Sequence, residues 1–422
     1  PRGAHQSRRK NHALEYAPQS CRKSLITTMP RHEKSAIWGA AFLMATSAIG
    51  PGFLTQTAFF TESIKASFGF VILISVLIDV VAQLNIWRII AITELHAQEI
   101  ANRVLFGLGV ALTLLIGVGG FAFNVGNVAG AGLGMNVLFG LDTQSGAIVS
   151  AAVAIGIFLF REMGKAIDVF VQLFGAILIL LTLYIAFAAK PPLAEVALKT
   201  VLPDRIDVLA ILTLVGGTVG GYITFAGGHR LLEAGITGKA ALPQVEQSAV
   251  SGILVTALMR SVLFLAAIGI VAQGLTLDKG NPAASVFELA AGKVGYKFFG
   301  MVLWAASLTS IVGSAYTTVS FLETLSAFLG KHRKGLIVGF IVLSTAVFVS
   351  IGKPVKILIA AGALNGVILP LSLGVMVAAA YRRVLVGDYK HPTWLAVSGV
   401  LVVILMSMMS VYSIVTEVQK LF

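Results

Sequence analysis

Apolar residues gather in long stretches separated by short connections rich in charged, glycine or proline residues. Most of these stretches approach the roughly 20 residues that a helix needs to cross a bilayer. The pattern predicts eleven transmembrane helices near residues 36–60, 68–92, 108–139, 146–160, 167–189, 208–226, 249–271, 298–325, 336–351, 357–381 and 394–415. We therefore expect an all-α integral membrane protein.

Two of these stretches contain glycines that interrupt a helix near mid-span, at 50–53 and at 216–224. Backbone groups left unpaired at that depth persist only where protein or a water-filled cavity meets them. Paired interruptions at corresponding places in two halves are the best sequence indication of a transporter's substrate site. The candidate substrate-binding residues at the breaks are Gly50, Pro51, Gly52, Phe53, Thr218, Gly220, Gly221 and Tyr222.

Ten of the predicted helices divide into two sets of five, each set beginning with an interrupted helix. An odd number of spans between the two interruptions places the second set upside down relative to the first. We expect a leader over 1–35, a transporter domain over 36–415 with repeats near 36–190 and 206–381, and an extra helix near 394–415. The spacing predicts a five-plus-five inverted repeat with discontinuous first and sixth helices.

Composition supports the membrane assignment, because 57% of the residues are hydrophobic and 12% are charged, against about 25% charged in soluble domains. The net charge of +12 resides mainly in short loops and in the leader, so it indicates orientation rather than nucleic-acid binding. We expect a cytoplasmic N-terminus, a bacterial inner membrane location and the lipid bilayer as partner. Cys21 is the single cysteine, which argues against disulfides and thiolate metal ligands in the spans.

Four segments in order resemble the NRAMP family of proton-coupled divalent metal transporters. Residues 39–53 resemble the family's first helix, which ends in Asp-Pro-Gly-Asn, and residues 134–140 read Gly-Met-Asn-Val-Leu-Phe-Gly where the family has Gly-Leu-Asn-Leu-Leu-Phe-Gly. Residues 217–219 match the lead-in to the family's Met-Pro-His, and residues 307–316 look like its eighth helix. The resemblance covers residues 36 to 415 and implies the family's fold, an inverted repeat of the LeuT/APC type with discontinuous first and sixth helices.

The resemblance also implies a changed site. The family's metal ligands, an Asp, an Asn and a Met, correspond to Gly50, Phe53 and Gly220, and its sixth-helix His corresponds to Tyr222. The acidic pair implicated in proton movement falls on Asn124 and Asn127. A divalent ion needs oxygen donors, with softer donors for selectivity, and a buried charge needs a counter-charge, so no metal-binding residue is predicted.

Several polar residues within the spans have both a functional and a structural interpretation. Asn124 and Asn127 either contact a solute or join helices by hydrogen bonds, and Phe53 and Tyr222 either contact a solute or plug the cavity. Asp79 either relays a proton or accepts a structural hydrogen bond. Arg260 is either its partner or the counter-charge of a solute carboxylate. Thr309 and Ser310 either contribute to a sodium site or bond back to their own helix.

The leading hypothesis is a secondary transporter for a small carboxylate or amino-acid-like solute, because half-helix N-termini favour carboxylates. One alternative is a divalent metal transporter that holds a hydrated ion through backbone oxygens, and a remote one is a non-transporting sensor. The coupling ion, sodium or proton, stays open. No nucleophile–base set or phosphate-binding loop is found in the sequence, so we expect neither an enzyme nor a cofactor.

Overall fold

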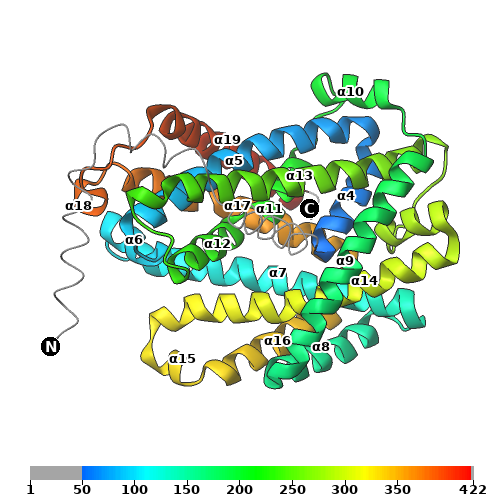
Figure 1. The fold of residues 1–422 in the computed structure, drawn as a ribbon, viewed down its shortest axis with the longest axis horizontal. Coiled ribbons are helices and arrows are strands. Elements are labelled where there is room, and N and C mark those ends of the chain that lie inside the picture. Colours follow the sequence, from blue (N-terminus) through cyan, green and yellow to red (C-terminus); the bar gives the residue numbers. More distant parts are fainter. Residues whose placement is uncertain (1–49, 420–422) are drawn as a thin grey trace, which may run out of the picture.

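The computed structural model describes residues 50–419, with the side chains of 161–174, 327 and 417–419 excepted. Every regular element within that range is helical (Figure 1). The predicted leader and the start of the first stretch lie outside the described residues. The all-α prediction is confirmed.

Each predicted stretch from residue 68 onward coincides with one helix or one pair of helices, and α4 covers the end of the first stretch. The long helices are α4 (Pro51–Ile64), α5 (Phe68–Thr93), α7 (Leu108–Phe139), α8 (Thr143–Leu159), α9 (Arg161–Ala188), α11 (Val208–Thr218), α12 (Gly221–Glu233), α13 (Leu242–Ala272), α14 (Pro282–Leu322), α16 (Arg333–Ile351), α17 (Pro354–Ala379) and α19 (Thr393–Gln419). Short helices join them: α6 (Ala97–Val104), α10 (Leu193–Val201), α15 (Ala327–Lys331) and α18 (Arg383–Val386).

The number of spans differs from the predicted eleven. Within the described residues, eight helices are long and apolar enough to cross a membrane, or nine if the bent pair Gly175–Ala188 and Leu193–Val201 counts as one. Two reasons are visible. The segment Pro51–Thr93 reads as one continuous candidate, and α8 has only 17 residues. The count of eleven is therefore not confirmed, although each predicted stretch contains a helix in the part that the structure describes.

Glycines allow the helices around α7 to approach one another closely. A methyl group on Gly130 would lie 2.1 Å from Pro51 Cβ, and one on Gly134 would lie 2.7 Å from Trp304 Cβ. Small residues at such interfaces let membrane helices pack backbone to backbone. The glycines of α7 thus bring the first turn of α4 and the middle of α14 against one helix.

The same relationship joins α11 to α17. A methyl group on Gly216 would lie 1.9 Å from the Gly362 carbonyl oxygen, and one on Gly366 would lie 2.3 Å from the Leu212 carbonyl oxygen. The backbones of α11 and α17 are thus in direct contact at a glycine of each helix. The close approach holds α11, the half-helix before the second break, against α17, the last helix of the predicted second repeat.

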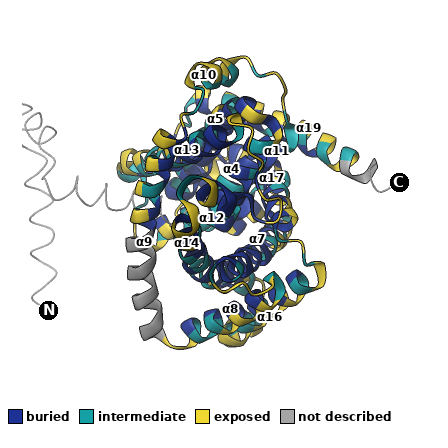
Figure 2. Ribbon diagram, turned by 90° about the vertical axis from the view of Figure 1, so that its right-hand side faces the viewer, coloured by how far each residue is buried: buried dark blue, intermediate teal, exposed yellow. Residues whose placement is uncertain are grey.

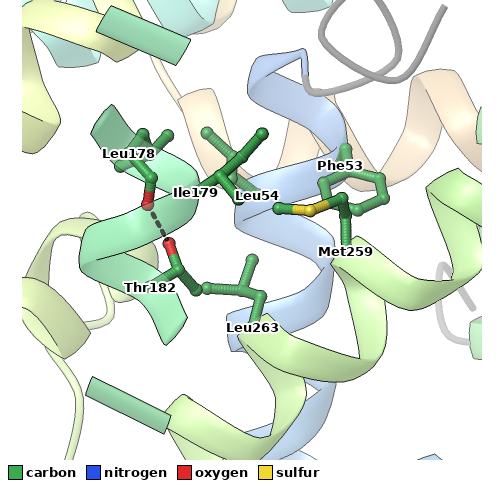
Figure 3. A pocket seen from close by; sticks show the side chains of 7 residues that line it. All are labelled: Phe53, Leu54, Leu178, Ile179, Thr182, Met259 and Leu263. Carbon is green, nitrogen blue, oxygen red and sulfur yellow. Dashed lines mark hydrogen bonds between the residues drawn. The ribbon is translucent and has the colours of Figure 1, made fainter. Parts of the chain in front are cut away.

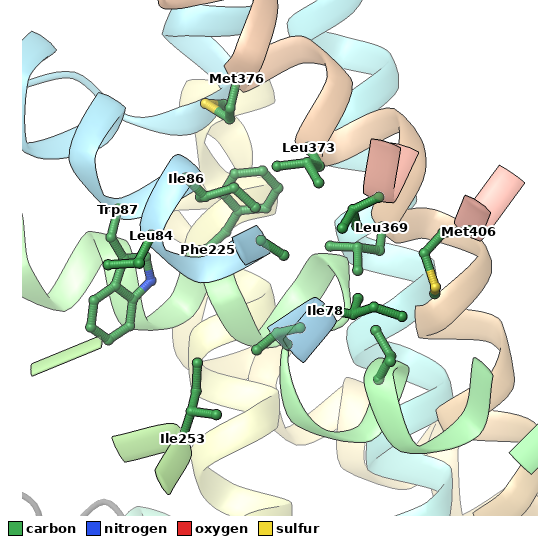
Figure 4. Packing of buried hydrophobic residues seen from close by; sticks show 14 of the residues in the cluster. Ile78, Leu84, Ile86, Trp87, Phe225, Ile253, Leu369, Leu373, Met376 and Met406 are labelled. Carbon is green, nitrogen blue, oxygen red and sulfur yellow. The ribbon is translucent and has the colours of Figure 1, made fainter. Parts of the chain in front are cut away.

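Among the described residues, buried positions lie in the interior of the bundle and exposed positions on its outside (Figure 2). The buried apolar side chains form two clusters. One cluster centres on α5, α12 and α17, where Ile86, Phe225 and Leu373 pack together (Figure 4). The other fills the space between α7, α8, α14 and α16. Exposed residues such as Leu77 and Leu401 face outward, as expected for a surface in lipid.

Candidate functional site

The second predicted break is present in the structure. α11 ends at Thr218, α12 begins at Gly221, and Gly220 between them is extended, with φ −49° and ψ 157°. Glycine is required here because a methyl group on Gly220 would lie 2.3 Å from the Gly216 carbonyl oxygen and 2.6 Å from Asn365 Cβ. The break therefore follows from close packing against α17 as well as from low helix propensity.

The first break is seen from its second half only. α4 begins at Pro51, after an extended Gly50 whose carbonyl oxygen accepts a hydrogen bond from Leu54 N at 3.3 Å. Neither Gly50 nor Gly220 supplies a side-chain cap to the helix that it starts. Both half-helices thus begin with backbone N–H groups that have no capping side chain, and such ends favour a negative charge.

Arg260 on α13 lies between these two breaks. Its side chain is 3% exposed, its guanidinium carbon lies 4.5 Å from the centroid of the Phe53 ring, and Nη1 donates to Thr218 Oγ1 at 3.3 Å. Phe53 belongs to the first turn of α4, and Thr218 ends α11. The side chain of Arg260 therefore connects the two half-helices that the sequence identified as the substrate site.

Asp79 on α5 faces the same place. It is 1% exposed, its Oδ1 has no hydrogen-bond partner among the described residues, and it interacts with the charge of Arg260 and with the Thr218 side chain. The Nε of Arg260 likewise has no partner in this part of the chain. The acid and the base thus meet across Thr218, each with one polar atom left unpaired, which is rare for buried groups.

A small apolar cavity is lined in part by Phe53 (Figure 3). Phe53 belongs both to this cavity and to the contact with Arg260. The side chains around the cavity are Phe53, Leu54, Leu178, Ile179, Thr182, Met259 and Leu263. Thr182 Oγ1 donates to its own helix, at Leu178 O, over 2.7 Å. The wall is therefore apolar, and the space inside is about that of one water molecule.

Asn124, Asn127 and Tyr222 come together in one hydrogen-bond network around Ser314 of α14. Ser314 Oγ donates to Asn124 Oδ1 at 3.0 Å and accepts from Asn127 Nδ2 at 3.2 Å, while Tyr222 OH donates to the Ser314 carbonyl oxygen at 3.4 Å. Asn124 Nδ2 also donates to Ser344 Oγ on α16 at 3.2 Å. In this conformation these groups bond to protein, and their predicted contact with a solute stays a prediction.

The candidate sodium ligands have a simpler environment. Thr309 Oγ1 donates to the Ala306 carbonyl oxygen at 3.0 Å, within its own helix. This is the usual arrangement of a hydroxyl in a membrane helix. The sodium role of Thr309 and Ser310 stays a prediction. Within residues 50–419, no group of three or more His, Cys, Asp or Glu side chains is arranged to hold a metal ion.

The sequence interpretation missed Gln56 and Asn365, two buried amides next to the breaks. Gln56 Nε2 donates to the Leu358 carbonyl oxygen at 2.9 Å and joins α4 to α17, and a methyl group on Gly217 would lie 3.0 Å from Gln56 Oε1. Asn365 Nδ2 donates to the Gly119 carbonyl oxygen at 3.0 Å. Both amide oxygens have no partner among the described residues. The available signal was an uncharged amide inside an apolar stretch.

Comparison with known proteins identifies the family. The family model described as natural resistance-associated macrophage protein-like matches residues 41–416. This chain belongs to the Nramp family. An uncharacterized membrane protein of Bacillus subtilis, YcsG, is 57% identical over 92% of this chain and 96% of its own length. An uncharacterized membrane protein of Haemophilus influenzae is 53% identical over 93% of this chain and 98% of its own length.

Solved structures share the fold of this Nramp member. The manganese transporter of Eremococcus coleocola superposes with a TM-score of 0.65 at 17% identity, over 91% of this chain and 87% of that one. Mhp1, in an inward-facing conformation, superposes with a TM-score of 0.58 at 14% identity, over 90% and 91%. The family and fold are those of membrane transporters, and the LeuT-like fold class is confirmed.

Proposed function

We propose that this Nramp-family protein is a secondary transporter that moves a small organic carboxylate, including amino-acid-like solutes, by alternating access. The observation that carries the proposal is the buried Arg260 side chain, which contacts both breaks through Phe53 and Thr218. A guanidinium stays charged in proteins and presents a planar fork that matches a carboxylate. The unpaired Nε supplies one donor of that fork.

The half-helix ends add to the same preference. The first turns of α4 and α12 offer backbone N–H groups with no capping side chain, and a helix N-terminus carries roughly half a positive charge. An anion seated between the breaks therefore meets three positive features, two helix ends and Arg260. The bare backbone at Gly50 leaves that approach open at the first break, because an added methyl group there would meet no heavy atom of the described residues within 4 Å.

The same features oppose a dehydrated divalent cation. The positions of the family's metal ligands carry Gly50, Phe53 and Gly220, which offer carbonyl oxygens and a hydrocarbon ring. The guanidinium of Arg260 lies against Phe53, so a metal ion there would meet a like charge at low dielectric. The fold also accommodates organic ligands, since a nucleobase-cation-symport-1 family transporter with bromovinylhydantoin bound superposes with a TM-score of 0.53 at 15% identity, over 90% of this chain and 93% of that one.

The test is uptake into proteoliposomes together with thermal-shift measurements on the purified protein. The probes are acetate, lactate, succinate, benzoate, alanine and proline, with Mn²⁺ as the competing class. We expect at least one carboxylate to raise Tm and to be taken up saturably, and Arg260→Gln to abolish both effects. Arg383→Gln, at an exposed position on α18, is the matched control and should leave them unchanged.

Saturable Mn²⁺ uptake with no response to any carboxylate would overturn the proposal in favour of the metal-transport alternative. Uptake of a carboxylate that Arg260→Gln leaves intact, in a folded variant, would remove Arg260 from the site. Arg260→Lys keeps the charge and loses the planar fork, so we expect weakened uptake from that variant.

A further inference from the structure

Asp79 and Arg260 carry opposite charges in one buried region beside Thr218, and a solute carboxylate would change that charge balance. Both side chains are buried, and Thr218 contacts both. If a carboxylate enters and binds Arg260, the site holds two negative charges and one positive charge. An uncompensated charge away from water costs several kcal/mol, and a buried ionisable group avoids that cost by becoming neutral.

We propose that Asp79 carries the coupling proton of this transporter, taking it up when the solute carboxylate replaces Asp79 as the partner of Arg260. This inference rests on the proposed function. The proton comes from water on the side where the solute enters, and an O–H bond forms on the Asp79 carboxylate. When the solute leaves on the other side, the proton is released there and Asp79 pairs with Arg260 again. One carboxylate and one proton cross in each cycle, so the cycle carries no net charge for a monocarboxylate.

The geometry supports an exchange of partners rather than a permanent ion pair. No hydrogen bond joins the two side chains directly in the described residues, and Asp79 Oδ1 and Arg260 Nε are each without a partner. A structural buried pair normally satisfies these atoms, because breaking or leaving one unpaired is destabilising. Thr218, at the end of α11, shares its hydroxyl with this pair, so bending at the break changes the contact between acid and base.

The surroundings of Asp79 contain no second charge that could serve as its partner. Among the described residues, Arg260 is the charged group that acts on it. The other ionisable side chains on helices packed against α5 have other environments. Glu246 forms an ion pair with Arg88, and Lys199 forms one with Asp204. Glu62 accepts a hydrogen bond from Leu277 N, and His229 packs against His96 and Phe321. The remaining ionisable residues on these helices are not among the groups that act on Asp79: Arg230, Glu233, Glu195, Lys356, Lys239 and Arg383.

The test measures the affinity of the purified protein for whichever panel carboxylate gives the largest thermal shift, between pH 5 and pH 8. If one proton binds with each solute, linkage requires the Kd to rise about tenfold per pH unit over part of this range. Asp79→Asn is neutral and nearly isosteric, so we expect the Kd of this variant for the solute to be independent of pH. Proteoliposomes that contain the variant should exchange solute but should not accumulate it when a proton gradient is applied. Asp388→Asn, at an exposed position, should behave as wild type.

The outcomes separate this inference from the proposed function. Absence of binding by every carboxylate at every pH would overturn both. Binding and uptake with a pH-independent Kd in the wild-type protein, or accumulation by Asp79→Asn driven by a proton gradient, would overturn the coupling role alone. A response limited to the zwitterions alanine and proline, without proton dependence, would mean that a solute ammonium group compensates Asp79. If Asp79→Asn does not fold, the pH dependence of the wild-type Kd alone still tests whether one proton binds with each solute.

Discussion

The guanidinium carbon of Arg260 lies 4.5 Å from the centroid of the Phe53 ring. This contact joins α13 to the first turn of α4, and a desolvated cation–π contact is worth about 2 kcal/mol. Phe53→Leu keeps an apolar side chain and removes the ring face. We expect Phe53→Leu to weaken the affinity for carboxylates and to lower Tm. A double-mutant cycle with Arg260→Gln should give a coupling energy of about 1 kcal/mol or more.

A second substitution at Phe53 serves as the control for this double-mutant cycle. Phe53→Tyr retains the ring face and should retain most of the coupling to Arg260. Additive effects of Phe53→Leu and Arg260→Gln on solute affinity would contradict a functional contact between the two side chains.

Gly220 should be intolerant of any side chain. A methyl group there would lie 2.3 Å from the Gly216 carbonyl oxygen, and overpacking of a tight site costs about 1–3 kcal/mol. Gly220→Ala should therefore lower Tm and slow transport. Gly339 in α16 has no heavy atom within 4 Å of an added methyl group, so Gly339→Ala should be neutral or raise stability by about 0.5–1 kcal/mol through helix propensity. Equal effects of the two substitutions on Tm would argue against the observed packing at the break.

Ser314 should matter for stability more than for solute recognition. Removing its hydroxyl in Ser314→Ala leaves Asn124 Oδ1 and Asn127 Nδ2 without this partner, and an unsatisfied buried polar group costs about 1–3 kcal/mol. The control is Ser320→Ala, because Ser320 Oγ donates only within its own helix, to Thr317 O at 2.7 Å. A normal Tm with lost solute binding would instead favour a direct solute contact for Asn124 and Asn127.

Stability should fall in mild acid because of His391, in the connection before α19. Burial and the charge of Arg88 lower the pKa of His391 to about 4 in the folded protein, below the value of about 6.5 for an exposed histidine. A histidine with a depressed folded pKa favours the neutral form, so its contribution is full above the unfolded pKa and is lost as pH falls through about 6.5 toward about 4.

The measurement is Tm as a function of pH for the wild-type protein and for His391→Gln. The variant keeps a hydrogen-bonding side chain opposite Asn85 Oδ1, which lies 2.9 Å from His391 Nε2, and it cannot titrate. We expect a smaller acid-induced fall in Tm for the variant. Parallel curves would show that other groups account for the pH dependence.

The sequence predicted the helices and the location of the second break because both follow from local composition. Long apolar stretches have only one way to satisfy their backbone in lipid, and the glycines around Gly220 mark where the helix stops. The pairing of Arg260 with Phe53 and Thr218 was not predictable, since the rotation of α13 depends on packing across the whole bundle. Gln56 and Asn365 were missed for the same reason, because an isolated amide in an apolar stretch does not show which helix it faces.

The backbone contact between α11 and α17 restricts how this protein can open. With Gly216 against the Gly362 carbonyl oxygen and Gly366 against the Leu212 carbonyl oxygen, neither helix can slide along the other without forcing main-chain atoms into overlap. We therefore expect the two helices to move together in any conformational change. We expect any bending between α11 and α12 to occur at Val219 and Gly220, the two residues that link these helices, of which Gly220 is extended.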